Sequence, residues 1–479
     1  MLLPILSILA ALNIGLTPQD RLEEAVAAAD RWIDGLAAEI DTLSLAVWKD
    51  AELSLEEVES SKRIASWLEQ HGFTVEPGIA GMPTAFRATW QNGSGPTIGL
   101  LVEYDALPGL SQVAGPKKQA RPDETSGHGC GHNLLGVGAA TAAIAARHAM
   151  EASGIPGRIE VFGCPAEERG IGKVLMARAG LFDKLDAALH WHPGDRNVVS
   201  DQSWLALNNV KFRFSGRSAH AAANPDAGRS ALDGVEIMNV AVNFLREHII
   251  DEARIHYVTT NGGQAPNVVP DVAEVWYFIR APRRDQVQAI YQRVVDCANA
   301  GALASGTEVT VHLQSALHDI LPNTVLGDVL YRHLERVGAP DYDEAAEKLA
   351  ADIAPTLPEA KERQLAHQVA RILDAPVFPA STDVGDVSYC VPTAGLQTAT
   401  WTPGTPYHSW QAVAQSGSTH GLLAMHTAAK TLAGCTLELM VRPDMLETAR
   451  EELAQRTGGE PYRCGLPESI GLEDITEDD

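Results

Sequence analysis

The sequence predicts an α/β protein with a mostly parallel sheet, into which a smaller α+β unit is inserted. Short apolar runs such as Thr97–Glu103 and Arg158–Cys164 alternate with Ala-rich helical segments up to about residue 203. Alternation of strands and helices is typical of a parallel sheet. From residue 204 to residue 317 the strands instead alternate apolar and polar residues around a long helix, and the first pattern returns afterwards. The middle unit therefore interrupts the first domain.

The length of 479 residues suggests two to three domains at ~150 residues each. We expect a main domain in two parts, 17–203 and 318–440, around the inserted unit 204–317. Residues 441–479 form a C-terminal extension that ends in an acidic tail.

The charge balance excludes one class of partner. The chain has 37 lysines and arginines against 62 aspartates and glutamates, a net charge of −25. So acidic a protein repels phosphate backbones, and we expect no nucleic-acid partner. Its six cysteines are sparse and irregularly spaced, which excludes a disulfide scaffold.

The first residues, Leu2–Leu16, are apolar. They lack the positive start of a secretory signal and are too short to span a bilayer. We therefore expect a buried or frayed segment, no membrane partner and a cytoplasmic protein. A cleaved signal on an exported protein is the alternative.

Local patterns define the elements of the main domain before the insertion. Residues 19–68 have helical periodicity. Strands are expected at 84–90, 97–103, 158–164 and 187–191, and helices at 132–150 and 171–179.

Within the insertion, alternating runs predict strands at 210–215, 273–280 and 309–314, with a helix at 229–248. After it, 342–363 is charged and Ala-rich, which predicts an exposed helical insertion, and 421–433 predicts an Ala-rich helix.

The strongest chemical signal is the Gly-rich segment Ser126–Asn133, in which Cys130 and His132 flank one glycine. Thiolate and imidazole are soft metal ligands, and glycine lets the backbone approach an ion closely. Taken alone, the segment could equally be a turn with a buried cysteine and a capping histidine.

Two adjacent carboxylates, Glu167 and Glu168, follow a buried strand. Their burial is costly without a cation, so one could ligate a metal while the other takes a proton from water. Solvated loop acids are the alternative. His192 at a strand end and His408 before a helix are further candidate ligands, with a structural histidine as the alternative for each. In open α/β sheets, ligands bind at the carboxyl ends of strands.

With these pieces in order, the chain resembles the co-catalytic metallopeptidases that include carboxypeptidase G, aminoacylases and auxin-conjugate amidohydrolases. The matching motifs run over about residues 20–435. They include Glu103–Pro108, Gly127–Asn133, Pro165–Glu168, Trp191–Pro193, Ser215–His220, Gly262–Gly263, Asn267–Pro270, Ser381–Asp386 and His408–Trp410.

The resemblance implies a metal-dependent amidohydrolase that cleaves an N-acyl amino acid or a dipeptide by a metal-activated water. It implies two divalent ions, zinc or manganese, and an insertion that serves as a lid and dimerisation domain. A homodimer is expected, and a heterologous partner chain is an alternative. The implied metal ligands are Cys130 as the bridge, His132, Glu168, His192 and His408.

The resemblance also implies roles for four other residues. Glu167 would be the general base, and His220 would polarise the scissile carbonyl, often from the other protomer. Asn267 and Arg280 are candidates for substrate contact.

Two departures affect the expected substrate. Glu103 precedes Asp105 where many auxin-conjugate relatives have Arg-Ala-Asp, and Asn133 stands where those relatives have aspartate. Both fit the aminobenzoyl-glutamate branch, so p-aminobenzoyl-glutamate-like substrates are favoured.

Several alternatives stay open. A β-alanyl-type dipeptidase is one, and His128, His190 and His420 compete for the metal roles. From other classes come a catalytically silent binding protein on the same fold and a cysteine amidase with Cys130 as nucleophile.

Overall fold

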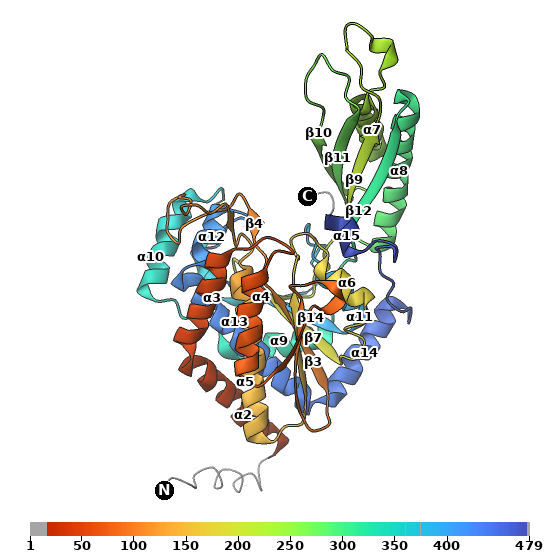
Figure 1. Cartoon of the computed structure of the whole chain (residues 1–479). Helices are drawn as coiled ribbons and strands as arrows, with labels where there is room; N and C mark the ends of the chain where they lie inside the picture. Colours follow the sequence, from red (N-terminus) through yellow and green to blue (C-terminus); the bar gives the residue numbers. More distant parts are fainter. Residues whose placement is uncertain (1–16, 360, 374, 477–479) are drawn as a thin grey trace.

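The computed structural model describes residues 17–359, 361–373 and 375–476. They form a larger body and a smaller unit that projects from it, which we call the lid (Figure 1). No helix in this part of the chain combines the length and the apolar character needed to cross a membrane. The apolar segment Leu2–Leu16 lies outside the described residues.

Among the described residues, an eight-stranded sheet forms the centre of the body, in the order β1-β2-β6-β3-β7-β14-β8-β13. Its inner strands run parallel, from β6 through β3 and β7 to β14. β1 and β2 extend one edge in antiparallel pairing. At the other edge β8 is antiparallel to β14 and parallel to β13. The bounds are β1 (Thr74–Pro77), β2 (Phe86–Asn92), β3 (Thr97–Glu103), β6 (Gly157–Cys164), β7 (Ala187–Gly194), β8 (Asn197–Ser200), β13 (Val369–Ile372) and β14 (Thr393–Ala399).

Helices cover both faces of this sheet. One face packs in a common core with α2 and α5, followed outward by α13 and α9, and the other packs against α6 and α11. The predicted helical stretch 19–68 is three helices. The bounds are α2 (Pro18–Gly35), α3 (Ala37–Asp50), α4 (Val58–Gln70), α5 (His132–Ser153), α6 (Gly172–Arg178), α9 (Thr324–Val337), α11 (Val384–Cys390), α12 (Trp410–Ser416) and α13 (Thr419–Val441).

Small residues let α5 lie very close to the sheet. A Cβ at Gly136 would meet the Glu103 carbonyl oxygen at 2.4 Å, and one at Gly138 would meet the Trp191 ring at 2.9 Å. The glycines therefore bring the first turn of α5, where His132 lies, against the end of β3. The fold thus places a candidate ligand beside a carboxylate.

The lid is a four-stranded antiparallel sheet in the order β10-β11-β9-β12, which packs against α7 and α8. Two of its elements, β10 and α8, were not predicted from the sequence. Together with the body sheet, it confirms the predicted class, an α/β protein with an inserted α+β unit. The domain boundaries 203/204, 317/318 and 440/441 stay predictions. The lid elements are β9 (Ala206–Ser215), α7 (Ala231–Leu245), β10 (Arg254–Asn261), β11 (Val272–Ala281), α8 (Arg284–Ser305) and β12 (Glu308–Leu317).

Two segments depart from simple expectation. Among the described residues of the predicted helical insertion 342–363, the only α-helix is α10 (Glu344–Ile353). It ends just before Pro355, because proline cannot continue an α-helix. After α13 the chain continues through α14 (Pro443–Thr457), and α15 (Leu472–Thr476) lies where the body meets the lid (Figure 1).

Candidate metal centre

The predicted donors come from different loops and strand ends of the body and meet at one place. Cys130 precedes α5, Glu168 follows β6, and His192 lies near the end of β7. His408 lies in the loop after β14, and its backbone N–H donates to the Gly129 carbonyl at 3.1 Å. That bond joins the two loops that carry Cys130 and His408.

Two groups of side chains have the spacing of metal ligands. The ligand atoms of Cys130, His132 and His192 lie within 4.8 Å of one another, and so do those of Cys130, Glu168 and His408. His408 Nε2 is 3.0 Å from Cys130 Sγ and 3.3 Å from a Glu168 oxygen. The five predicted ligands are therefore brought together, and Cys130 is common to both groups.

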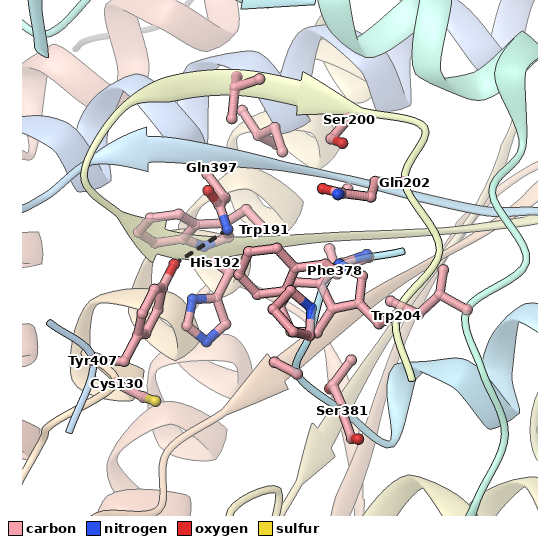
Figure 2. A pocket seen from close by; sticks show the side chains of 18 of the residues that line it. Cys130, Trp191, His192, Ser200, Gln202, Trp204, Phe378, Ser381, Gln397 and Tyr407 are labelled. Atoms are coloured by element: carbon pink, nitrogen blue, oxygen red, sulfur yellow. Dashed lines mark hydrogen bonds between the residues drawn. The ribbon is translucent and has the colours of Figure 1, made fainter. Parts of the chain in front are cut away.

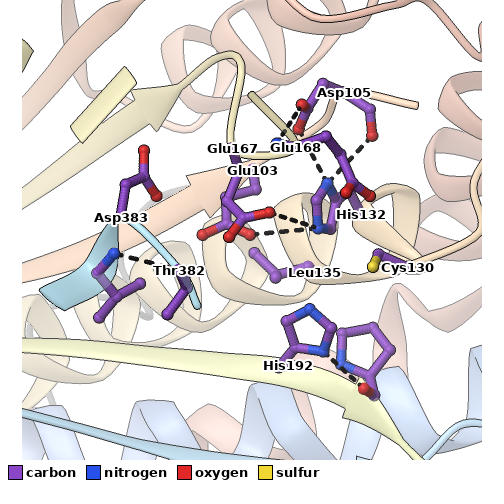
Figure 3. Close-up of polar contacts among 12 residues, drawn as sticks. Glu103, Asp105, Cys130, His132, Leu135, Glu167, Glu168, His192, Thr382 and Asp383 are labelled. Atoms are coloured by element: carbon purple, nitrogen blue, oxygen red, sulfur yellow. Dashed lines mark hydrogen bonds and ion pairs between the residues drawn. The ribbon is translucent and has the colours of Figure 1, made fainter. Parts of the chain in front are cut away.

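Asp105 fixes the orientation of His132. Its Oδ1 lies 2.9 Å from His132 Nδ1, and its Oδ2 accepts from the backbone N–H of Glu168 at 2.9 Å (Figure 3). One carboxylate thus holds two of the predicted ligands. His132 Nε2 is buried without a hydrogen bond, as expected of a nitrogen that is presented to a metal while the other nitrogen is held by a carboxylate.

A second buried network lies beside the donors. The Lys173 ammonium contacts Glu103 Oε1 at 2.7 Å and Asp383 Oδ1 at 2.5 Å, and all three side chains are almost fully buried. The other Glu103 oxygen has no hydrogen bond and lies 3.4 Å from His132 Nε2. Glu103, His132 and Glu167 form a further group with ligand spacing (Figure 3).

The electrostatics of the site are those of a cluster of anions and imidazoles. Burial, followed by the charges of Glu103 and Asp383, raises the pKa of Glu167 well above its usual value. Burial and then Glu168 raise the pKa of Cys130, and a bound cation reverses this by favouring the thiolate. Burial lowers the pKa of His192 to about 4, which keeps its imidazole neutral.

These residues fit a pair of divalent ions. They offer one thiol, three imidazoles and a carboxylate, the ligand types of zinc and similar ions. The unpartnered His132 Nε2 and one unpartnered Glu168 oxygen are both buried, and a buried polar atom without a partner is costly unless something binds it.

The competing histidines lie outside these groups. His128 Nε2 is 3.0 Å from the Val47 carbonyl oxygen. The His420 ring stacks on Tyr342 with centroids 4.3 Å apart. His190 lines the neighbouring cavity but belongs to neither group with Cys130.

Three predicted residues lie on the lid. Arg280 lines the cavity, whereas His220 and Asn267 do not. Both of these are exposed, and His220 Nδ1 accepts from the backbone N–H groups of Ala222 and Ala223. The expected roles of His220 and Asn267 therefore stay predictions.

Sequence reasoning assigned no role to Asp105, Glu103, Lys173 or Asp383. Glu103, Asp105 and Asp383 occur in the motifs that carry the resemblance, so that match was the available signal. Lys173 had none, because its partner Asp383 lies 210 positions away in the chain.

A cavity of about 810 Å³ adjoins the donors and extends between body and lid. Figure 2 shows Cys130, His192 and Tyr407 on one side and the rings of Trp204 and Phe378 on the other. Those two rings are 4.7 Å apart. From the lid, Arg280 lies over the ring of Phe278, 5.4 Å from its centroid. The cavity therefore has an aromatic side and a cationic group.

Comparison with known proteins supports the same conclusion. A family model described as the M20 peptidase dimerisation domain matches residues 207–305. The chain is 40% identical to one of the two chains of the p-aminobenzoyl-glutamate hydrolase of Escherichia coli, over 88% of this chain and 94% of that protein. It is 32% identical to an Xaa-Arg dipeptidase of Mus musculus, over 92% of each.

Solved structures share the fold. A putative aminohydrolase from methicillin-resistant Staphylococcus aureus has a TM-score of 0.62 and 17% identity, over 87% of this chain and 99% of that one. A dinuclear metal binding peptidase from the M20 family of Bacillus subtilis has a TM-score of 0.57 and 16% identity, over 85% and 99%.

The fold and the sequence relatives define a hydrolase of amide or peptide bonds, built on the fold of a dinuclear metal-binding peptidase. The chain belongs to the M20 peptidase family, which confirms the resemblance found in its motifs. Its lid carries the dimerisation domain of that family.

Proposed function

We propose that this hydrolase binds two divalent ions, zinc or manganese, and cleaves the amide bond of an N-acyl amino acid or dipeptide, with p-aminobenzoyl-glutamate-like substrates favoured. One observation carries the proposal. Two groups of ligand atoms, each within 4.8 Å, share Cys130, and Glu167 adjoins them. Cys130, His132, Glu168, His192 and His408 would hold the ions.

Glu167 is the general base in this proposal. Bound divalent ions supply Lewis acidity, which makes water a better nucleophile and an amide carbonyl a better electrophile. Glu167 takes the proton of the attacking water and then hands it to the nitrogen of the leaving amine. Its location in a buried anionic cluster raises its pKa, which suits a group that must hold a proton between these two steps. His220, from this chain or a partner protomer, would polarise the carbonyl.

Arg280 supports an anionic substrate. Its guanidinium lines the cavity, whereas the cavity residue Asp195 is already paired with Lys361 at 2.8 Å and Asp201 with Arg371 at 2.7 Å. A substrate carboxylate can therefore pair with Arg280, and Asn267 is a second candidate contact. The aromatic pair Trp204 and Phe378 suits an aryl acyl group.

A dipeptidase of the β-alanyl type is the second candidate, favoured by the 32% identity to an Xaa-Arg dipeptidase. A homodimer through the lid is part of the proposal. The other chain of the Escherichia coli p-aminobenzoyl-glutamate hydrolase is itself 27% identical to this protein, over 49% of its length. A heterologous partner chain is therefore the alternative to test.

The deciding experiment combines metal analysis with a substrate panel. Purified protein would be analysed for bound metal and assayed with zinc, manganese or cobalt on p-aminobenzoyl-glutamate, acetyl-glutamate, β-alanyl-lysine and β-alanyl-arginine. We expect two ions per chain, highest kcat/KM on the aryl substrate, loss of activity with chelator and rescue by metal. Activity that survives complete metal removal would indicate the cysteine amidase instead, and light scattering would give the oligomeric state.

A further inference from the structure

Two chain crossings join lid and body. The first, 201–205, leads from β8 to β9, and the second, 318–323, leads from β12 to α9. They are joined by a bond from the Ser203 hydroxyl to the Ile320 carbonyl at 2.7 Å. A junction of two short crossings leaves two units free to move relative to each other unless something else ties them.

The C-terminal segment 460–476 lies across this junction (Figure 1). The Tyr462 hydroxyl donates to Asp386 Oδ1 at 2.7 Å, and the same oxygen lies 3.0 Å from His318 Nδ1. Asp386 belongs to α11 of the body, and His318 begins the second crossing. Tyr462 therefore completes a contact that holds the crossing against the body.

The rest of the segment contacts both units. On the body side, Arg178 of α6 donates to the Pro467 carbonyl at 3.1 Å and to the Ile470 carbonyl at 2.8 Å. On the lid side, a Cβ at Gly465 would meet the Ala316 carbonyl of β12 at 2.8 Å, and α15 packs on the same strand. Leu466 and Ile475 are each 1% exposed, so the segment is anchored by buried side chains.

The segment also reaches the candidate site. The Ile475 carbonyl accepts from Arg169 Nη2 at 3.2 Å. Arg169 follows Glu168 directly and lines the cavity. The cavity is itself formed by both units, because Trp204 and Phe378 face Phe278 and Arg280 of the lid. Its shape therefore depends on the angle between lid and body.

We propose that residues 460–476 are a strap that sets the angle of the lid on the body and positions Arg169 beside the candidate metal centre. The strap is a positioning element, and its catalytic consequence rests on the proposed function. Its mechanical consequence does not, because the angle and mobility of the lid can be measured without substrate.

Two sets of variants of the full-length, metal-loaded protein test the strap. The first is the double substitution Tyr462→Phe and Arg178→Met, which removes three hydrogen bonds and leaves the chain complete. The second is truncation after Gly459, with truncation after Thr476 as the matched control that removes only acidic residues beyond α15.

We expect hydrogen exchange at 201–205 and 318–323 to become at least about tenfold faster in the double variant, since local opening follows the number of bonds that hold a segment. We expect kcat and KM to change together, as for hinge residues, and kcat/KM to fall ~10- to 100-fold, the effect of a displacement of about 1 Å. Bound metal and the control truncation should match the wild type.

Exchange within twofold of the wild type in the folded double variant would overturn the strap, whatever the truncation does. Faster exchange with unchanged kcat/KM would overturn the positioning of the site. If the wild type hydrolyses no amide at all, the proposed function fails and the exchange result still decides the strap.

Discussion

The buried ammonium of Lys173 offers the sharpest test of the electrostatic account. Lys173→Met keeps the length of the side chain and removes the charge that contacts Glu103 at 2.7 Å and Asp383 at 2.5 Å. Removing one partner of a buried ion pair costs about 3–5 kcal/mol, because the remaining charge is left uncompensated. We expect a loss of at least this size here, since two carboxylates lose their cation.

The loss should depend on pH with a definite sign. Burial raises the pKa of Asp383 to about 6, although Lys173 lowers it. Its folded pKa is therefore above the unfolded value of about 3.9, and the contribution of the group to stability is lost as pH rises through the folded pKa. Without Lys173 the folded pKa rises further, so the deficit of the variant should be small near pH 5 and grow towards pH 8.

The assay is urea unfolding of the metal-free protein in chelator at the two pH values, with the midpoint and slope recorded for each. The matched control adds Glu103→Gln and Asp383→Asn to Lys173→Met, which leaves no buried charge and should recover most of the loss. Equal midpoints for Lys173→Met and wild type at about pH 8, or a deficit larger at about pH 5, would refute the reasoning.

Three further predictions concern the candidate metal centre. Glu167→Gln should abolish turnover and leave two ions bound, as measured by kinetics and metal analysis on one preparation; retention of most activity would exclude Glu167 as the base. Cys130→Ser should weaken at least one metal site in a zinc titration, because a hydroxyl is a harder and less acidic ligand; identical affinity would remove Cys130 from the ligands. Asp105→Asn should lower metal affinity or activity ~10- to 100-fold, since Asp105 holds His132 Nδ1 at 2.9 Å; unchanged affinity and kcat would count against that role.

The sequence predicts the strands and their ends better than it predicts the network around the site. The strand 97–103 is predicted with its observed bounds, because a buried parallel strand is a continuous apolar run. The helix α8 (Arg284–Ser305) was missed, since the mixture of charged, polar and small residues along it hides its apolar stripe. α10 is shorter than the predicted insertion, because Pro355 interrupts it.

The same division applies to the site. Cys130, His132, Glu168, His192 and His408 are recognisable by residue type and by their place at strand ends or in loops. The partners that orient them are not, because such pairing depends on distances between segments far apart in the chain. The contact of Lys173 with Asp383 joins α6 to the start of α11, and no local pattern in either helix indicates the other.

The glycines of α5 connect these two levels. Gly136 and Gly138 belong to no catalytic motif, but each faces the sheet at a distance that a Cβ would not allow. An alanine at Gly136 would press on the Glu103 carbonyl, and α5 would have to move outward by a fraction of an ångström or more. Such a shift would carry His132 away from Asp105, and a ligand displaced by about 1 Å is enough to lose most of a catalytic rate. The small-residue composition that predicted a tightly packed helix therefore also sets the geometry of the site, and packing and chemistry are specified by the same residues.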